Sequence, residues 1–148
     1  MVEFKVNEKK GGGWDIITQL IAFQRWTVQV GVFSDAPEEV QDKANWAEFG
    51  TVNLPVRSWN RKWFDERSRT IYSKIGHATK LIRAGALSAA QAVDQLVAWM
   101  EGDCKAYVEQ GRVVPPNADS TVKRKGHSTP LIDTHEFVDH IRARKIRQ

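Results

Sequence analysis

Hydrophobic residues recur at two different periods along this chain, and the periods divide it into expected strands and helices. Alternation of apolar and polar side chains predicts strands over residues 2–6 and 26–33, the second with its valines on one face. Apolar residues spaced three and four apart predict helices over 14–24 and 38–46. A last strand is expected over 141–147, where apolar residues alternate with arginines to give a basic outer face.

Two longer amphipathic segments occupy the middle of the chain. Helical spacing starts after Ser58, a suitable N-cap, and stops at Gly85, which suits a left-handed C-terminal cap. Ser88 and Gln91 have the spacing of a capping box that opens a second long helix, and Gly111 ends it. Because only a short turn joins the two helices, we expect them to pack antiparallel.

Short helices complete the pattern, one ending at Gly126 and one starting from a second capping box at 133–136. The order of elements predicts an α+β fold, in which a small antiparallel sheet packs against two long antiparallel helices plus short helices. No repeat or low-complexity linker interrupts the sequence. Residues 1–148 are therefore expected to form a single domain.

Composition is that of an ordinary globular domain, with 148 residues, 41% hydrophobic and 27% charged. The one cysteine, Cys104, excludes an intramolecular disulfide, and its place on a helical stripe predicts core packing. There is no recognisable signal peptide and no apolar run near the roughly 20 residues that span a bilayer. We expect a soluble protein made in the cytoplasm, with no membrane contact.

The net charge of +4 is concentrated near the C-terminal end. Residues 112–148 hold eight lysines and arginines against four acidic residues, a difference that equals the net charge of the whole chain. The cluster Lys123-Arg124-Lys125 has three possible interpretations: a solvated helix end, the rim of a protein interface, or a contact with DNA phosphates. The residues alone leave these alternatives open.

Candidate catalytic chemistry is sparse. His135 and Asp139, like Glu136 and His140, are four residues apart and could share a helical face, but no second cluster completes a metal site. No Gly-x-Ser-x-Gly elbow is present, and the paired carboxylates lie in polar stretches that would not raise a pKa. We expect no enzymatic activity, no metal and no cofactor.

Four sequence stretches occur in an order that resembles a known family. They are VGVF (30–33), AEFGT (47–51), LPVRSWNRKWFD (54–65) and PPNADSTVKRKGHSTPLIDT (115–134). Together they are similar to the tail-completion, or neck, proteins of tailed bacteriophages, the family that includes lambda's tail-completion protein. The resemblance covers roughly residues 30–141. It departs from the family after LIDT, where a glycine is replaced by histidine, and at Arg-Ser-Trp, which stands for arginine-proline-phenylalanine.

The resemblance implies a structural virion protein, made in the host cytoplasm and located at the head–tail junction. Such proteins form homo-oligomeric rings, commonly hexamers, that join a portal-side adaptor or connector to a tail terminator or tail tube protein. The ring would complete the joint between a DNA-filled head and the tail, with packaged DNA in its channel. Two alternatives remain: a tail terminator or other tail ring protein, and a free-standing non-specific DNA-binding protein.

Two groups of candidate site residues follow from the motifs and the charge distribution. The residues expected at a subunit interface are Trp46, Phe49, Arg57, Trp59 and Trp63. The residues expected to face a DNA channel or an acidic partner are Lys123, Arg124, Lys125, Arg142 and Arg144.

Overall fold

The computed structural model describes residues 13–113, 115–126 and 135–148. Its elements in chain order are α1 (Gly13–Gln24), β1 (Trp26–Gly31), α2 (Glu38–Phe49), α3 (Trp59–Arg83), α4 (Ala89–Glu109), α5 (Asp119–Lys125), α6 (Glu136–Asp139) and β2 (Arg142–Arg147). The predicted α+β fold is confirmed, with a two-stranded antiparallel sheet and two long helices packed together. The strand expected over 2–6 lies outside the described residues.

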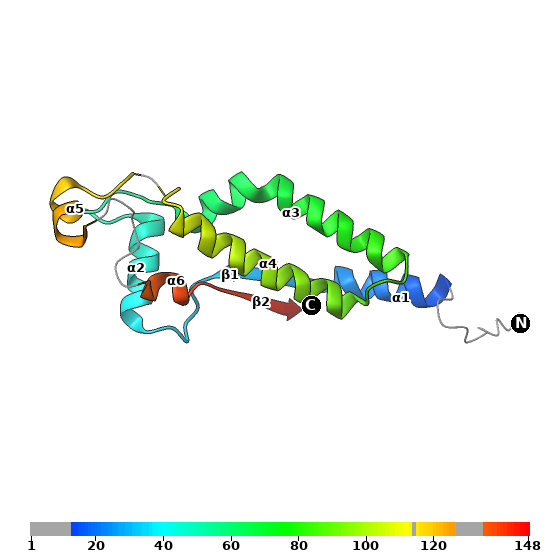
Figure 1. Ribbon diagram of the computed structural model, residues 1–148. Coiled ribbons are helices and arrows are strands. Elements are labelled where there is room, and N and C mark those ends of the chain that lie inside the picture. The colour runs from blue at the N-terminus through cyan, green and yellow to red at the C-terminus, as the bar shows by residue number, and fades with distance from the viewer. Residues whose placement is uncertain (1–12, 114, 127–134) are drawn as a thin grey trace, which may run out of the picture.

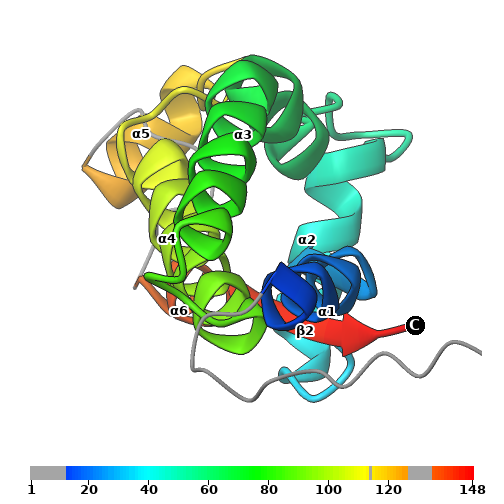
Figure 2. The ribbon, with the colours of Figure 1, turned by 90° about the vertical axis from the view of Figure 1, so that its right-hand side faces the viewer.

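The helices α3 and α4 form the long axis of the molecule (Figure 1). They run antiparallel, as predicted, through a turn in which Gly85 has a φ of 71°. The sheet packs against α4, while α1 lies end to end with β1 and packs on both long helices (Figure 2). α2, α5 and α6 gather at the opposite end from the start of α1 (Figure 1).

The strands pair with Trp26 opposite Arg147 and Gly31 opposite Arg142. Residues directly opposite each other in an antiparallel pair share a face of the sheet. The face that carries Val28 and Val30 packs against the hydrophobic core, as their alternation predicted. Arg144 lies on the outer face, where its guanidinium stacks over Phe33 at 4.1 Å from the ring centroid.

One main hydrophobic core joins α2, α3, α4 and α6, and a smaller one docks α1. Members of the main core that are almost completely buried include Val40, Trp63, Cys104, Tyr107, Val108 and Ile141. In the smaller core, Leu20 and Phe23 of α1 pack against Ala78, Ile82 and Ala92. Core packing of Cys104 is confirmed, and burial followed by the charge of Asp103 raises the pKa of its thiol to about 12.

Helix ends follow the sequence only in part. The capping box of α4 is present, because Ser88 Oγ accepts from the Gln91 N–H at 3.2 Å and Gln91 Oε1 accepts from the Ser88 N–H at 2.9 Å. Ser58 precedes α3 but its side chain makes no capping hydrogen bond. A carboxylate from another helix takes that role, as described below. At α6 the N-cap residue His135 is in the left-handed region, with φ 62°.

Glu101 on α4 holds the outer edge of β2. Its Oε2 accepts a hydrogen bond from the Ala143 N–H at 2.9 Å, and Oε1 pairs with Lys105 at 3.0 Å and Arg142 at 3.6 Å. Burial by itself would raise the pKa of Glu101. The Ala143 hydrogen bond and the two cations outweigh it, so the pKa lies below its ordinary value of 4.5.

This lowered pKa predicts a pH-dependent effect of Glu101→Gln. A carboxyl whose folded pKa is depressed stabilises the fold above its unfolded pKa and loses that contribution as pH falls through the folded value. We expect Glu101→Gln to lower the free energy of unfolding by about 1–2 kcal/mol at pH 7. The deficit should shrink as pH falls below 4.5. Urea unfolding across this range measures it, and the exposed Glu109→Gln on the same helix is the control. A deficit that does not change with pH would contradict the assignment.

Candidate functional site

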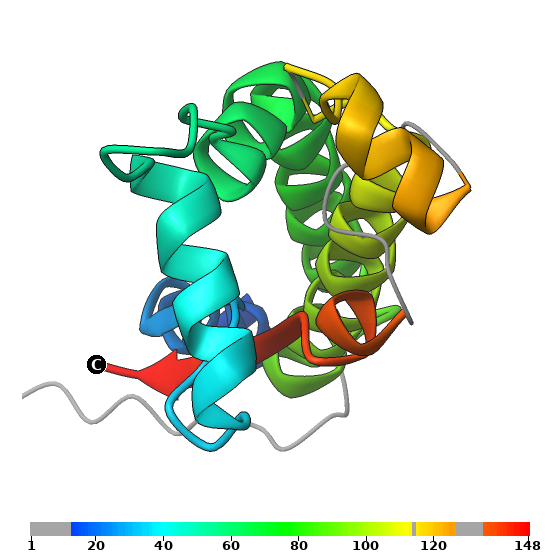
Figure 3. The same ribbon diagram turned by 90° about the vertical axis from the view of Figure 1, so that its left-hand side faces the viewer.

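Three of the four motif stretches meet in the part of the molecule around α2. The second stretch, 47–51, covers the end of α2 and the turn that follows it. The third, 54–65, runs from the loop after α2 into α3, and the described part of the fourth, 115–126, contains α5. Seen from this end, α2, α5 and α6 face the viewer and α3 and α4 run away behind them (Figure 3). Segments about 60 positions apart in sequence are joined here by Arg57, whose Nε donates to the Pro115 carbonyl at 2.8 Å and Nη2 to that of Pro116 at 3.2 Å.

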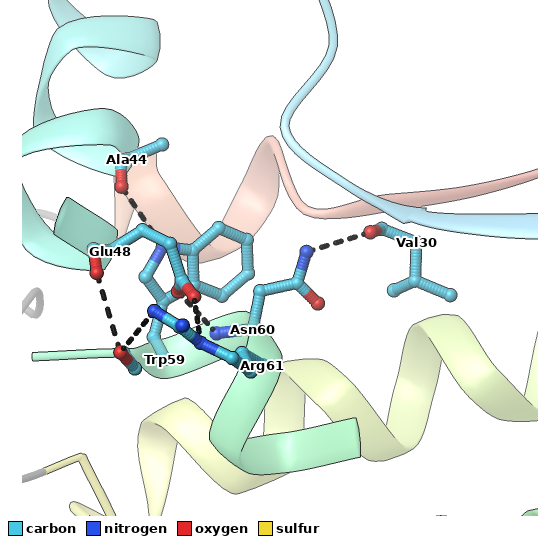
Figure 4. A network of polar contacts seen from close by, with 7 residues as sticks. Val30, Ala44, Glu48, Trp59, Asn60 and Arg61 are labelled. Atoms are coloured by element: carbon cyan, nitrogen blue, oxygen red, sulfur yellow. Dashed lines mark hydrogen bonds and ion pairs between the residues drawn. The ribbon is translucent and has the colours of Figure 1, made fainter. Parts of the chain in front are cut away.

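A polar network around Glu48 connects α2, α3 and β1 (Figure 4). Glu48 Oε2 accepts from the backbone N–H of Asn60 at 3.1 Å, and Oε1 lies 3.5 Å from Arg61 Nε. The carboxylate therefore satisfies an otherwise unpaired N–H in the first turn of α3 and lies at the positive end of its dipole. Asn60 Nδ2 in turn donates to the Val30 carbonyl at 2.9 Å, which fixes β1 to the start of α3.

The turn after α2 depends on Gly50. Its φ of 74° and ψ of 174° lie in a region that is essentially restricted to glycine. A Cβ at this position would lie 2.9 Å from Val56 Cγ2 and 3.1 Å from the Leu54 carbonyl oxygen. The chain then returns to α2, where the Arg57 N–H donates to the Ala47 carbonyl at 2.7 Å. Glu48, Gly50 and Arg57 of the motifs therefore hold the loop between α2 and α3 in its conformation.

This loop and the end of α2 expose a set of large apolar side chains. The set, called the α2–α3 patch from here on, consists of Trp46, Phe49, Val52, Leu54 and Val56. It contains half of the large hydrophobic residues that are exposed in the described part of the chain, within eleven consecutive positions. Exposed apolar side chains of this size are candidates for contact with another protein.

The predicted interface residues separate into two groups. Phe49 is 71% exposed and Trp46 is 47% exposed, so both are available to a neighbouring chain. Trp59 and Trp63 are 2% and 1% exposed, so their side chains belong to the core of this chain and leave little surface for a neighbouring chain. Their indole N–H groups find partners inside the chain: the Ala44 carbonyl at 3.2 Å and the Asp103 carboxylate at 2.9 Å. Arg57 is half-buried and acts as an internal clamp.

Sequence reasoning missed Val52, Leu54 and Val56 as surface residues of the site. The signal was present in the sequence, because loops are usually polar and the stretch TVNLPV carries three apolar residues in a connection between helices. Glu48 was also missed as the residue that caps α3. It lies ten positions before Ser58, the local candidate, so the sequence offers no direct sign of its role.

The predicted basic residues do not form one surface. Lys123 and Arg124 are exposed on α5 and make no ion pair among the described residues, and Lys125 is the last residue of that helix. Arg142 and Arg144 lie on β2, away from α5 (Figure 1), and pair with acids of the same chain, Glu101 and Asp35 respectively. The excess positive charge of the sequence is therefore partly neutralised within the fold.

A hollow of about 710 Å³ separates the loop after α2 from α5. Lys43, Arg57 and Arg124 line it together with Leu54, Pro115 and Phe137. Within the residues that the structure describes, no group of three or more histidine, cysteine or acidic side chains is placed to hold a metal ion. None of the described helices has the length and hydrophobicity needed to cross a membrane.

Comparison of this chain with protein-family models, with curated proteins and with solved structures gives no match.

Proposed function

We propose that this chain is a structural protein of the neck of a tailed bacteriophage, where copies of it form a ring between the DNA-filled head and the tail. The observation that carries the proposal is the physical role of the motif residues. Glu48, Gly50 and Arg57 of the family-like stretches build the loop that exposes the α2–α3 patch. Motifs that fix a loop with exposed apolar side chains suit a protein that functions by assembly with other chains.

A closed ring of identical subunits uses two different surfaces on each copy, and each must be complementary to the other. The α2–α3 patch supplies one such surface, with Phe49 and Trp46 as aromatic anchors and the charged residues of α2 as its rim. The resemblance to neck proteins implies a hexamer, with a portal-side adaptor on one side and a tail terminator or tail tube protein on the other.

A free-standing DNA-binding protein is the weaker proposal. Of the predicted basic residues, Lys123 and Arg124 are exposed without an ion-pair partner in the described chain, whereas Arg142 and Arg144 pair with acids. Two phosphate contacts give only weak, salt-sensitive binding. In the ring proposal, Lys123 and Arg124 face packaged DNA in the channel or an acidic neighbouring protein.

Phe49→Asp tests the proposal. Because Phe49 is 71% exposed, its replacement should change the free energy of unfolding by no more than about 0.5 kcal/mol. A charge in the apolar contact should nevertheless abolish assembly. The measurement is in vitro joining of filled heads to free tails from particles made without this protein, after adding purified wild type or variant.

Wild-type protein should restore joined, infectious particles, and Phe49→Asp should restore at most a few per cent of that number. Gln95→Asp, an exposed change in the N-terminal half of α4, is the matched control and should join particles like wild type. If wild-type protein joins no particles, the neck function is rejected. If Phe49→Asp joins as well as wild type, the patch is not the interface.

A further inference from the structure

The two-layer fold leaves part of α3 uncovered. The sheet packs on α4, and α1 covers the C-terminal half of α3 through Leu20 and Phe23. A groove of about 460 Å³ lies between β1, α1 and α3. It is lined mainly by apolar side chains that include Phe23, Trp26, Val28, Phe64, Ile71 and Tyr72. Phe64 is 43% exposed and Tyr72 is 66% exposed, although both belong to the side of α3 that borders the sheet.

β1 borders this groove with a free edge. The Gln148 N–H donates to the Arg25 carbonyl at 2.8 Å, so this pair is hydrogen-bonded across the sheet. Hydrogen-bonded and non-hydrogen-bonded pairs alternate in an antiparallel ladder, so the backbone groups of Trp26, Val28 and Val30 point away from β2. Asn60 binds the Val30 carbonyl on that side. The N–H and C=O groups of Val28 have no such partner among the described residues.

The width of the sheet explains why the groove exists. Neighbouring strands lie about 4.8 Å apart and packed helices about 8–10 Å apart, so two strands cover roughly one helix. Here β1 and β2 cover α4. A third strand on the free edge of β1 would lie over the exposed part of α3 and would bury Phe64 and Tyr72.

The sequence contains a segment suited to that position. Val2, Phe4 and Val6 alternate with Glu3 and Lys5, a pattern typical of a half-buried strand, and these residues precede the described part of the chain. Apolar side chains on one face could enter the groove while the charged residues remain in water.

The same copy can place this segment on its own sheet only with a fully extended linker. α1 has 12 residues and lies end to end with β1 (Figure 1). From the rise per residue in a helix and in a strand, Val28 is about 28 Å from the start of α1. Eight residues separate Phe4 from Gly13, and the nine steps between these two residues span about 30 Å only when the backbone is fully extended. That linker includes Gly11 and Gly12, for which fixing an extended backbone costs most entropy.

We propose that residues 2–6 of a second copy of this chain bind the free edge of β1 as a third strand, with their apolar side chains in the groove between β1 and α3. This interface rests on the proposed function in one respect, because both need copies of the chain to associate. The segment and the groove are two different surfaces that fit each other, which is the kind of contact that a ring of identical subunits requires. Backbone hydrogen bonds to Val28 give affinity, and the groove selects the apolar face of the segment.

Cross-linking between differently labelled chains tests the proposal. A Phe4→Cys chain and a tagged Tyr72→Cys chain are unfolded in urea, refolded together and treated with a short bismaleimide. The native Cys104 is buried, so it should not react in the folded protein, and wild-type protein verifies this. We expect a covalent heterodimer in the mixture. It should be lost when Glu109→Cys, an exposed position near the far end of α4, replaces Tyr72→Cys.

A chain that carries both Phe4→Cys and Tyr72→Cys tests the alternative, in which the segment binds the groove of its own copy. If it forms only an internal cross-link at high dilution, the segment occupies its own groove and the second-copy proposal is overturned. Absence of any cross-link also overturns it. Adding Val2→Asp and Val6→Asp to the Phe4→Cys chain should abolish the heterodimer, and circular dichroism checks that the fold remains. A heterodimer that persists with both aspartates contradicts the apolar contact.

The outcome is independent of the location of the protein in a virion. A heterodimer can form even if the chain is absent from the head–tail junction, which would reject the proposed function alone. Conversely, a ring at the junction without this cross-link would reject the strand exchange and leave the neck function intact.

Discussion

Trp63→Ala is expected to destabilise the chain by about 3–5 kcal/mol, because it removes a tryptophan side chain that is almost completely buried. Trp63 is surrounded by α3, α4 and the sheet, and its Nε1 donates to Asp103 at 2.9 Å. The substitution opens a cavity and leaves the Asp103 carboxylate with only Arg67, 3.0 Å away, as a partner at this site. A loss of this size is a large part of the stability of an ordinary domain.

Urea unfolding followed by circular dichroism measures this effect. Trp46→Ala is the matched control, because it removes the same side chain from a site that is 47% exposed. We expect the control to lose at most about 1 kcal/mol. Equal losses for the two variants would contradict the assignment of Trp63 to the core and of Trp46 to the surface.

Gly50→Ala should have the second largest effect, a destabilisation of about 2–4 kcal/mol. The backbone at Gly50 has a φ of 74°, and the new Cβ would lie 2.9 Å from Val56 Cγ2. Relief of this contact requires the loop after α2 to move, which would displace Val52, Leu54 and Val56 of the α2–α3 patch. We therefore expect Gly50→Ala to impair head–tail joining even at temperatures where most molecules are folded.

Gly76→Ala provides a control of opposite sign. Gly76 is exposed in α3 and a Cβ there has no heavy atom within 4 Å outside its own helix and neighbours. Alanine should stabilise the helix by about 0.5–1 kcal/mol because it restricts the unfolded chain. Thermal unfolding compares the two variants, and a stabilising Gly50→Ala would refute the strained turn.

Much of the fold could be predicted from the sequence because its signals are local. Helical spacing in α3 and α4, and the Ser88–Gln91 capping box, depend on residues within one or two turns, and the structure has them where the pattern placed them. Alternation along 26–33 likewise predicted β1 and its core-facing side. The N-cap of α3 could not be predicted in the same way, since Glu48 comes from another helix.

The candidate site was less predictable, because exposure depends on partners that lie far away in sequence. Trp46 and Trp63 have the same side chain, yet only Trp63 is buried. Its indole N–H is satisfied by the carboxylate of Asp103, which lies 40 positions away in the sequence. Arg144 looked free to bind DNA in the sequence. In the fold it pairs with Asp35, 109 positions away.

The most direct measurement is a cryo-EM reconstruction of the head–tail junction in particles that carry this chain. The account predicts a closed ring of copies below the portal-side adaptor, with the α2–α3 patch of each copy buried against its neighbour. Lys123 and Arg124 should face the channel or an acidic surface of an adjoining protein. A reconstruction in which the neck is complete and contains no density for this chain would contradict the account.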